Sequence, residues 1–173
     1  MSFTLSSRNK NPRNLAKIAA ISLAGVLITA LTIFCIYLFS TKDTLNAELI
    51  APGINNPVTV KFDQHAVPHI SANNLEDAWY TLGFLHATER PWQMEFNRRL
   101  ASGKLSEILG PESVGLDKFI RTLGIRRAAE KQFENYPIEY KRQIQAYAEG
   151  VNAGFARLGW ALPAEFMILG AKP

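Results

Sequence analysis

The sequence predicts an α+β chain that is mostly helical and is preceded by one transmembrane helix. Residues 18–39 contain no charged side chain. Residues 58–63 alternate apolar and polar side chains, as a half-buried strand does. After Asn74, apolar side chains recur every three or four positions, which is typical of amphipathic helices. We therefore expect strands near residue 60 and helices over most of the chain that follows.

The apolar stretch "IAAISLAGVLITALTIFCIYLF", residues 18–39, predicts an uncleaved signal anchor. A helix of this length is about 33 Å long and can cross a hydrocarbon core of roughly 30 Å. The exit sequence "CIYLFSTKD" is bulky and lacks the small-x-small site of a cleaved signal peptide. Cys35 is preceded by the bulky Phe34, which is unlike a lipid-attachment cysteine.

The charges that flank this stretch predict its orientation. Four basic residues and no acid precede it, namely Arg8, Lys10, Arg13 and Lys17. By the positive-inside rule, the tail of residues 1–17 is cytoplasmic, and residues 40–173 lie in the periplasm or outside the cell. The same four charges equal the whole net charge of +4, so the high isoelectric point gives no support to nucleic-acid binding.

The cysteine content and the lack of a glycosylation sequon fit a bacterial periplasmic or cell-surface setting for the exported part, and with the predicted span we expect a single-pass protein of the bacterial inner membrane. Cys35, the only cysteine, lies within the predicted span, and the chain has no N-x-Ser/Thr sequon. The exported part therefore forms no internal disulfide, and its stability must come from packing or from a bound ion.

The first exported segments predict a linker and two extended stretches. Residues 40–56 read as a linker with a loop at "APGINNP". In "VTVKFD", Val58, Val60 and Phe62 share one face. After a turn at "QHA", the stretch "VPHISA" continues extended, because Pro68 disfavours the helical region for the residue before it. The domain proper, residues 57–173, begins here.

A long helical stretch follows. Asn74 opens it, with Asp77 three positions later in a capping-box-like arrangement. We expect a kink at Pro91 and an end at Gly103. A helical wheel places seven apolar residues in one stripe: Leu75, Trp79, Leu82, Leu85, Trp92, Phe96 and Leu100.

Two further helical regions are predicted. The second spans Glu112 to about Asn135 and is broken near Gly124. The third begins at Pro137, a residue suited to the first helical position. Its apolar residues lie three and four apart: Ile144, Tyr147, Ala148, Val151, Phe155 and Leu158.

Polar residues within the apolar stripe predict a buried network. His86, Glu89 and Gln93 fall inside the stripe, and buried polar groups require partners. We interpret them chiefly as a structural network between helices, with acid–base catalysis as the minor alternative. Arg98 and Arg99 are expected to flank the core, with one of them paired to a nearby acid.

Sequence motifs identify no reaction. His65 and His69 are four apart, but Pro68 lies between them in an extended segment, so a metal site there is weakly supported. The chain contains no P-loop, dinucleotide fingerprint, G-x-S-x-G elbow or H-E-x-x-H sequence.

Five strings in order resemble the penicillin acylase family of N-terminal-nucleophile hydrolases. They are "VKFDQHAVPHISA", "GFLHATERPWQMEFNRRLASGKLSEILG", "LDKFIRTLGIRRAA", "AYAEGVNAGF" and "LPAEFMILGAKP". The resemblance covers about residues 58–173. It implies a four-layer αββα fold. The helices of this chain would wrap the core of that fold, and the strands of this chain would join its edge.

The resemblance also implies an activity. Family members are exported precursors, or zymogens, that cut themselves into an alpha subunit and a larger beta subunit. The new N-terminal serine of the beta subunit attacks an amide, and its own α-amino group acts as the base. An oxyanion hole in the beta subunit stabilises the intermediate. The substrates are acylated small molecules, such as β-lactam antibiotics or acyl-homoserine lactones.

This chain corresponds to the front of the alpha subunit. The nucleophile, the oxyanion donors and the alpha-subunit glutamate that helps hold the family's calcium ion are expected after Pro173. The resemblance therefore assigns no catalytic, substrate-binding or metal-binding role within this chain, which is expected to be inactive alone. Calcium is implied only for the full-length enzyme. The implied partners are the beta subunit or C-terminal part of the same precursor, a small-molecule amide, and the lipid bilayer through residues 18–39.

The chain departs from the family pattern at several positions. Ala66 stands where glycine is usual, Glu89 replaces an aspartate, and Pro91 replaces a leucine. Many members have a cleaved signal peptide, whereas this chain is predicted to be anchored. Two alternatives stay open: a complete membrane-anchored helical module that binds a periplasmic partner without catalysis, and the remnant of a decayed acylase gene.

Overall fold

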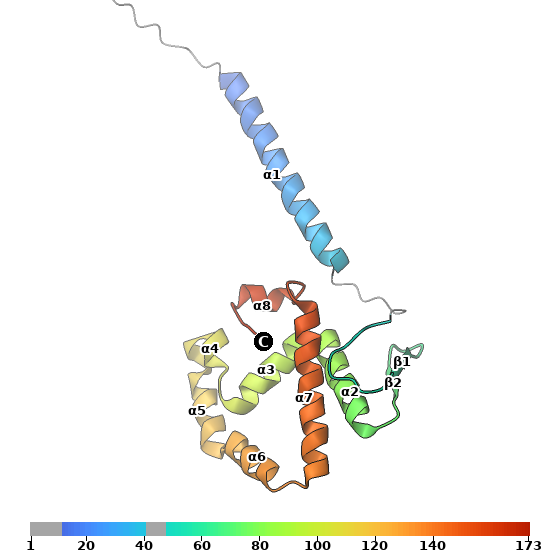
Figure 1. Ribbon diagram of the computed structural model, residues 1–173. Coiled ribbons are helices and arrows are strands. Elements are labelled where there is room, and N and C mark those ends of the chain that lie inside the picture. The colour runs from blue at the N-terminus through green and yellow to red at the C-terminus, as the bar shows by residue number, and fades with distance from the viewer. Residues whose placement is uncertain (1–11, 41–47) are drawn as a thin grey trace, which may run out of the picture. The chain divides into compact units, whose positions relative to one another are not determined.

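The computed structural model describes residues 12–40 and 48–173. The predicted tail up to residue 11 and linker residues 41–47 lie outside the described residues. The chain divides into two compact units, residues 1–43 and 44–173. The first contains α1 (Pro12–Ser40) (Figure 1). Within α1, Lys17–Phe39 is long and apolar enough, by length and composition, to cross a membrane.

The second unit begins with a β-hairpin. Strands β1 (Thr59–Phe62) and β2 (Pro68–Ser71) pair antiparallel. Along β1, exposed and half-buried side chains alternate, which confirms the predicted strand. In the turn, Ala66 has a φ of +59°. This left-handed conformation costs a residue with a Cβ roughly 1–2 kcal/mol, so the turn keeps the geometry that a glycine would favour.

Helices make up most of the rest of the unit, as the sequence predicts. They are α2 (Leu75–Glu89), α3 (Pro91–Ser102), α4 (Ser106–Leu109), the 3₁₀ turn η1 (Pro111–Ser113), α5 (Val114–Leu123), α6 (Ile125–Glu134), α7 (Ile138–Leu158) and α8 (Ala164–Ile168). Figure 1 shows α2 and α7 side by side, while α3 to α6 leave this pair and lead back to the start of α7.

The helix ends lie where local chemistry places them. The Asn74 side chain accepts a hydrogen bond from the Asp77 N–H at 2.7 Å, so the predicted cap of α2 is confirmed. At Pro91 the helix breaks rather than kinks, with Arg90 at φ −138° and ψ 49° between α2 and α3. Gly103 ends α3 in the left-handed conformation, φ 62°, and Gly124 does the same for α5 at 72°.

Helices α2 and α7 approach each other more closely than side chains usually allow. A Cβ added to Gly150 of α7 would lie 1.9 Å from the carbonyl oxygen of Tyr80. One added to Gly83 of α2 would lie 2.1 Å from the carbonyl oxygen of Tyr147. Gly154 continues the series one turn later. Figure 1 shows the two helices pointing the same way, so they run parallel, and they touch backbone to backbone.

The buried face of α2 differs from the predicted apolar stripe. Leu75 and Trp79, at the start of that stripe, are 64% and 40% exposed. The buried residues of α2 are Asp77, Tyr80, Thr81, Gly83 and Ala87. The prediction ranked faces by large apolar side chains, whereas small residues allow α7 to come close and exclude water.

We expect Gly150→Ala to lower the free energy of unfolding by about 3 kcal/mol, because its Cβ would overlap a backbone oxygen. The measurement is urea unfolding of residues 44–173, followed by far-ultraviolet circular dichroism. Gly115→Ala is the control, since Gly115 lies in α5 with nothing within 4 Å of its added Cβ. That change should raise the stability by roughly 0.5–1 kcal/mol. Equal stability of the two variants would contradict the close contact.

Candidate functional site

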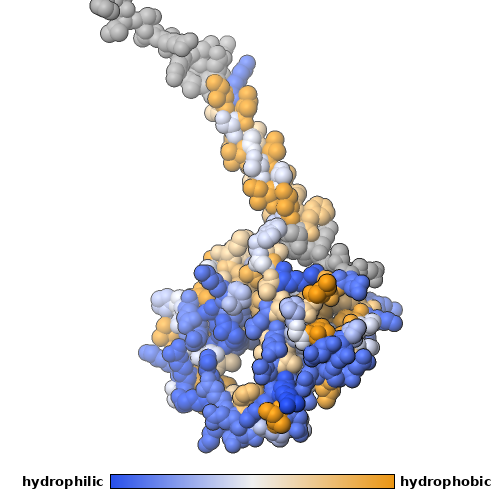
Figure 2. All heavy atoms as spheres, in the orientation of Figure 1, coloured by the Kyte–Doolittle hydropathy of each residue, from blue (hydrophilic) through white to orange (hydrophobic). Residues whose placement is uncertain are grey.

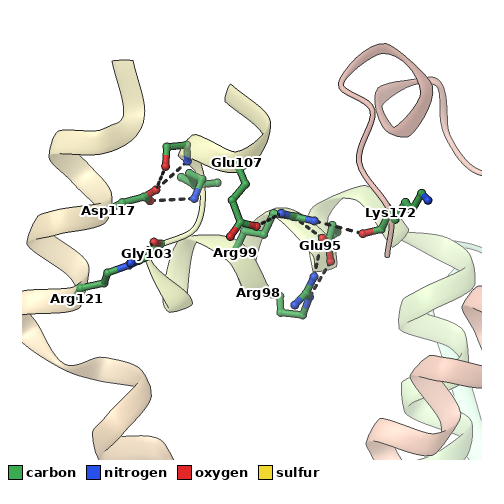
Figure 3. Close-up of polar contacts among 10 residues, drawn as sticks. Glu95, Arg98, Arg99, Gly103, Glu107, Asp117, Arg121 and Lys172 are labelled. Atoms are coloured by element: carbon green, nitrogen blue, oxygen red, sulfur yellow. Dashed lines mark hydrogen bonds and ion pairs between the residues drawn. The ribbon is translucent and has the colours of Figure 1, made fainter. Parts of the chain in front are cut away.

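A charged network surrounds Glu95 of α3, whose side chain is only 1% exposed (Figure 3). The Nε and Nη2 atoms of Arg98 donate to its two carboxylate oxygens, each at 2.7 Å. Arg99 donates through Nε at 2.5 Å. A buried carboxylate requires such partners, because desolvation would otherwise cost several kcal/mol. The hydrogen bond with Glu95 raises the pKa of Arg98. The predicted arginine–acid pairing is confirmed, and both arginines take part.

Arg99 links three parts of the domain. Besides Glu95, its Nη1 donates to the Glu107 carboxylate of α4 at 2.7 Å. Its Nη2 donates to the main-chain carbonyl of Lys172, after α8, at 3.3 Å. Figure 3 shows the Arg99 side chain between Glu107 and Lys172. The fork of guanidinium donors suits such a junction, since its nitrogens point in fixed, different directions.

Asp117 of α5 holds the start of α4. It accepts hydrogen bonds from the N–H of Leu105 at 2.9 Å and of Ser106 at 2.8 Å, and from the Ser106 hydroxyl at 2.6 Å. Arg121, one turn further along α5, donates to the carbonyl of Gly103 at 2.8 Å. Burial alone would raise the pKa of Asp117, but the hydrogen bonds from Ser106 and Leu105 outweigh it and leave that pKa below the usual value.

A third buried carboxylate, Asp77, fastens residues 51–57, which we call the strap, to α2. The backbone N–H groups of Asn55 and Asn56 donate to its two oxygens at 2.9 and 3.0 Å. The hydroxyl of buried Tyr80 donates to a strap carbonyl. Burial would raise the pKa of Asp77, but the hydrogen bonds, those of Asn55 foremost, outweigh it and lower that pKa. The strap is the loop "APGINNP" that the sequence predicts.

An open apolar groove of about 620 Å³ lies along α2 and α7. We call it the aromatic groove; it is lined by Trp79, Tyr136, Pro137, Tyr140, Gln143, Ile144 and Tyr147. Trp79 and Tyr147 meet edge to face, with ring centroids 6.4 Å apart. The groove can accept an apolar group, but nothing among its lining residues is arranged for bond cleavage.

The predicted buried network of His86, Glu89 and Gln93 is wrong, because all three side chains are exposed. His86 instead shares a hydrogen bond of 2.9 Å between its Nδ1 and the hydroxyl of Tyr147. His86 and Glu89 fall outside the buried positions of α2, and the break before Pro91 places Gln93 in the separate helix α3. The buried polar residues of the described chain are Asp77, Thr81, Glu95 and Asp117.

His65 and His69 are both exposed near the hairpin turn. His69 Nε2 lies 3.3 Å from the Asp63 carboxylate, and the Gln64 side chain donates to His65 at 3.2 Å. In residues 12–40 and 48–173, no three histidine, cysteine or acidic side chains converge to hold a metal ion.

Residues 57–173 match the penicillin amidase family, and the chain belongs to this family. It is 42% identical over 129 residues to the penicillin acylase 2 proenzyme of Pseudomonas sp. strain SE83, covering 75% of this chain and 16% of that protein. It is 36% identical over 121 residues to an acyl-homoserine lactone acylase of Pseudomonas aeruginosa, covering 70% and 14%. The chain thus spans about a sixth of the length of these curated relatives.

A solved structure supports the fold. A thermostable penicillin G acylase from Alcaligenes faecalis aligns with a TM-score of 0.62 and 26% identity, covering 68% of this chain and 64% of that chain. The predicted membership in the penicillin acylase family and the fold of a penicillin acylase chain are therefore confirmed. The solved chain is also several times shorter than the Pseudomonas proenzyme, as the covered shares show.

We expect Asp77→Ala to release the strap, because the backbone N–H groups of Asn55 and Asn56 lose their acceptor. Hydrogen exchange of these two amides, followed by NMR or mass spectrometry, should become at least tenfold faster. Glu76→Ala is the matched control, since Glu76 is exposed on the same turn. Unchanged protection in Asp77→Ala would show that the strap is held by other contacts.

We also expect stability to fall in acid. The folded-state pKa values of Asp77 and Asp117 lie below the usual 3.8. Their contribution is therefore fully present well above pH 3.8, and it is lost as the pH falls through the lowered folded-state values. Unfolding midpoints between pH 6 and pH 2.5 measure this effect. The double variant Asp77→Asn/Asp117→Asn should show a weaker dependence, and an equal dependence would assign the acid loss to other carboxylates.

Proposed function

We propose that this chain is the front section of an exported, membrane-anchored precursor whose full-length form hydrolyses the amide bond of an acylated small molecule. The observation that carries the proposal is the family match over residues 57–173. One relative of each named activity supports it: a penicillin acylase is 42% identical to the chain, and an acyl-homoserine lactone acylase is 36% identical. Both names describe removal of an acyl group from an amine-bearing small molecule, which is the substrate class we propose here.

The small part of each relative's length that this chain covers supports a longer precursor. The chain covers 16%, 14% and 19% of three of them, and one of these is named a proenzyme. We therefore propose that the remaining polypeptide supplies the reaction centre. Its N-terminal serine, released by self-cleavage, attacks the amide carbonyl, and the adjacent α-amino group accepts the serine proton.

Exposed apolar faces support a large intramolecular partner. Phe119 and Leu123, on one face of α5, are 58% and 57% exposed, and Leu116 shares that face. α6 has no fully buried residue. Figure 2 shows hydrophobic residues exposed among hydrophilic ones, and a hollow in the surface between these helices and α7. Such faces favour contact with further apolar surface. In the proposed enzyme, the remaining polypeptide covers them and forms the central sheets of the αββα fold.

The anchor is the third part of the proposal. The apolar stretch within α1 has the length of a membrane span, and the basic residues before it favour a cytoplasmic N-terminus. We propose that α1 holds the precursor in the bacterial inner membrane, with the domain in the periplasm or outside. Alkaline phosphatase fused after Asp43 should be active, and the same fusion after Lys10 should not.

The test begins with the reading frame downstream of codon 173. The full-length product should self-cleave and release acid from penicillin G or from an acyl-homoserine lactone, measured by mass spectrometry. Residues 44–173 alone should release none, because the nucleophile lies outside them. A stop codon followed by an unrelated gene would favour an anchored binding module. A stop before recognisable downstream acylase sequence would indicate a decayed gene. Turnover by residues 44–173 alone would overturn the proposal.

A further inference from the structure

Residues 48–50, which directly precede the strap, are exposed and belong to no helix or strand. Ile50 is 99% exposed, the highest fraction among the exposed large hydrophobic side chains of the described residues, and Leu49 is 46% exposed. Within the part of the chain that the structure describes, no hydrogen bond joins the backbone of residues 48–50 to the rest of the domain. The Ile50 side chain and the backbone beside it are therefore open to an external partner.

The backbone becomes firmly held immediately after this stretch. The carbonyl of Pro52 accepts the hydrogen bond from the Tyr80 hydroxyl. A Cβ added to Gly53 would lie 3.0 Å from the Tyr80 ring, so the strap rests directly on that ring. Asp77 then accepts from the next two backbone N–H groups, those of Asn55 and Asn56. The boundary between open and held backbone therefore lies between residues 50 and 52.

The hairpin turn shows that exposure alone does not produce such a stretch. Val67 is 50% exposed and also aliphatic. Its N–H donates to the Asp63 carboxylate at 3.0 Å, and its carbonyl accepts from the Asp63 N–H at 3.1 Å. Both backbone groups of Val67 are thus already paired, whereas those of residues 48–50 are open.

An open aliphatic stretch that ends at a held segment has the form that an endopeptidase requires. A protease pairs with the backbone of an extended substrate and places one side chain in a specificity pocket. Such exposed segments are preferred sites of proteolytic cleavage. Pro52 opposes binding beyond this stretch, because it has no N–H and its φ is fixed. The cleavable bonds are therefore those that follow Leu49 and Ile50.

We propose that residues 48–50 are a proteolytic release site, at which an endopeptidase that takes aliphatic side chains separates the domain from α1. The inference rests on the membrane anchor of the proposed function. Hydrolysis consumes one water and breaks one peptide C–N bond. It leaves a carboxylate on the α1 side and an α-amino group on the domain side. The contacts of the strap with Asp77 and Tyr80 lie beyond the cut, so the released domain keeps its fold.

The experiment displays the full-length precursor on bacterial spheroplasts and adds elastase, which takes small and branched aliphatic side chains. Mass spectrometry of the released protein should find a new N-terminus at Ile50 or Ala51 before any cut at the hairpin turn. The same N-termini should occur in the soluble periplasmic fraction of untreated cells. Leu49→Asp/Ile50→Asp should slow release at least tenfold without changing the melting temperature. Val67→Asp is the matched control and should be released at the wild-type rate.

Asp77→Ala tests whether the strap sets the end of the site. Without the acceptor for Asn55 and Asn56, the strap opens more often, and elastase should then also cut within residues 53–57. Glu76→Ala should give the wild-type cleavage pattern. An Asp77→Ala pattern that equals the wild-type pattern would overturn the role of the strap as the limit of cleavage.

Other results would overturn the release site itself. They are a first wild-type cut in the strap or the hairpin turn, unchanged release of the double aspartate variant, and a domain found only in the membrane fraction of untreated cells. Residues 48–50 that are cut in detergent but protected on spheroplasts would lie in the bilayer interface, which also overturns it. Acid release from penicillin G is measured on the same samples. A precursor that is never cut but releases acid overturns this inference alone, and a released protein without turnover overturns the proposed hydrolysis alone.

Discussion

The backbone contact between α2 and α7 is the constraint on which the rest of the domain depends. Gly83 and Gly150 bring the two helices so close that a carbonyl oxygen of each occupies the space of the other's missing Cβ. This contact holds the two helices parallel. It therefore fixes both ends of the segment α3 to α6, which connects the end of α2 to the start of α7. It also places Trp79 and Tyr147 side by side as a wall of the aromatic groove.

Around this pair, buried carboxylates hold the irregular segments. Asp77 binds the strap, and Asp117 binds the start of α4. Glu95 pairs with Arg98 and Arg99. The fully buried hydrophobic residues of the described chain are few: Tyr80, Ala87, Leu105, Phe166 and Ala171. Charged and backbone hydrogen bonds therefore decide where loops lie, since each carboxylate satisfies donors that burial would otherwise leave unpaired.

The predictable features were those set by neighbours in the sequence. The alternation around Val60, the cap at Asn74, and the glycine ends at Gly103 and Gly124 depend on local sterics and hydrogen bonds, and all are confirmed. The buried face of α2 depends on how closely α7 approaches, which no local pattern reveals. Asp117 accepts hydrogen bonds from residues eleven and twelve positions away. The residues next to it in the sequence therefore do not reveal that it holds the start of α4.

The parallel course of α2 and α7 has a consequence for how related chains can diverge. Two neighbouring helices that point the same way cannot be joined by a short turn, so a return path must carry the chain back to the starting end. Here α3 to α6 provide that path, and α6 contributes no fully buried residue to the unit. Insertions and deletions among relatives should therefore gather around α6, while the glycines of the paired helices resist replacement.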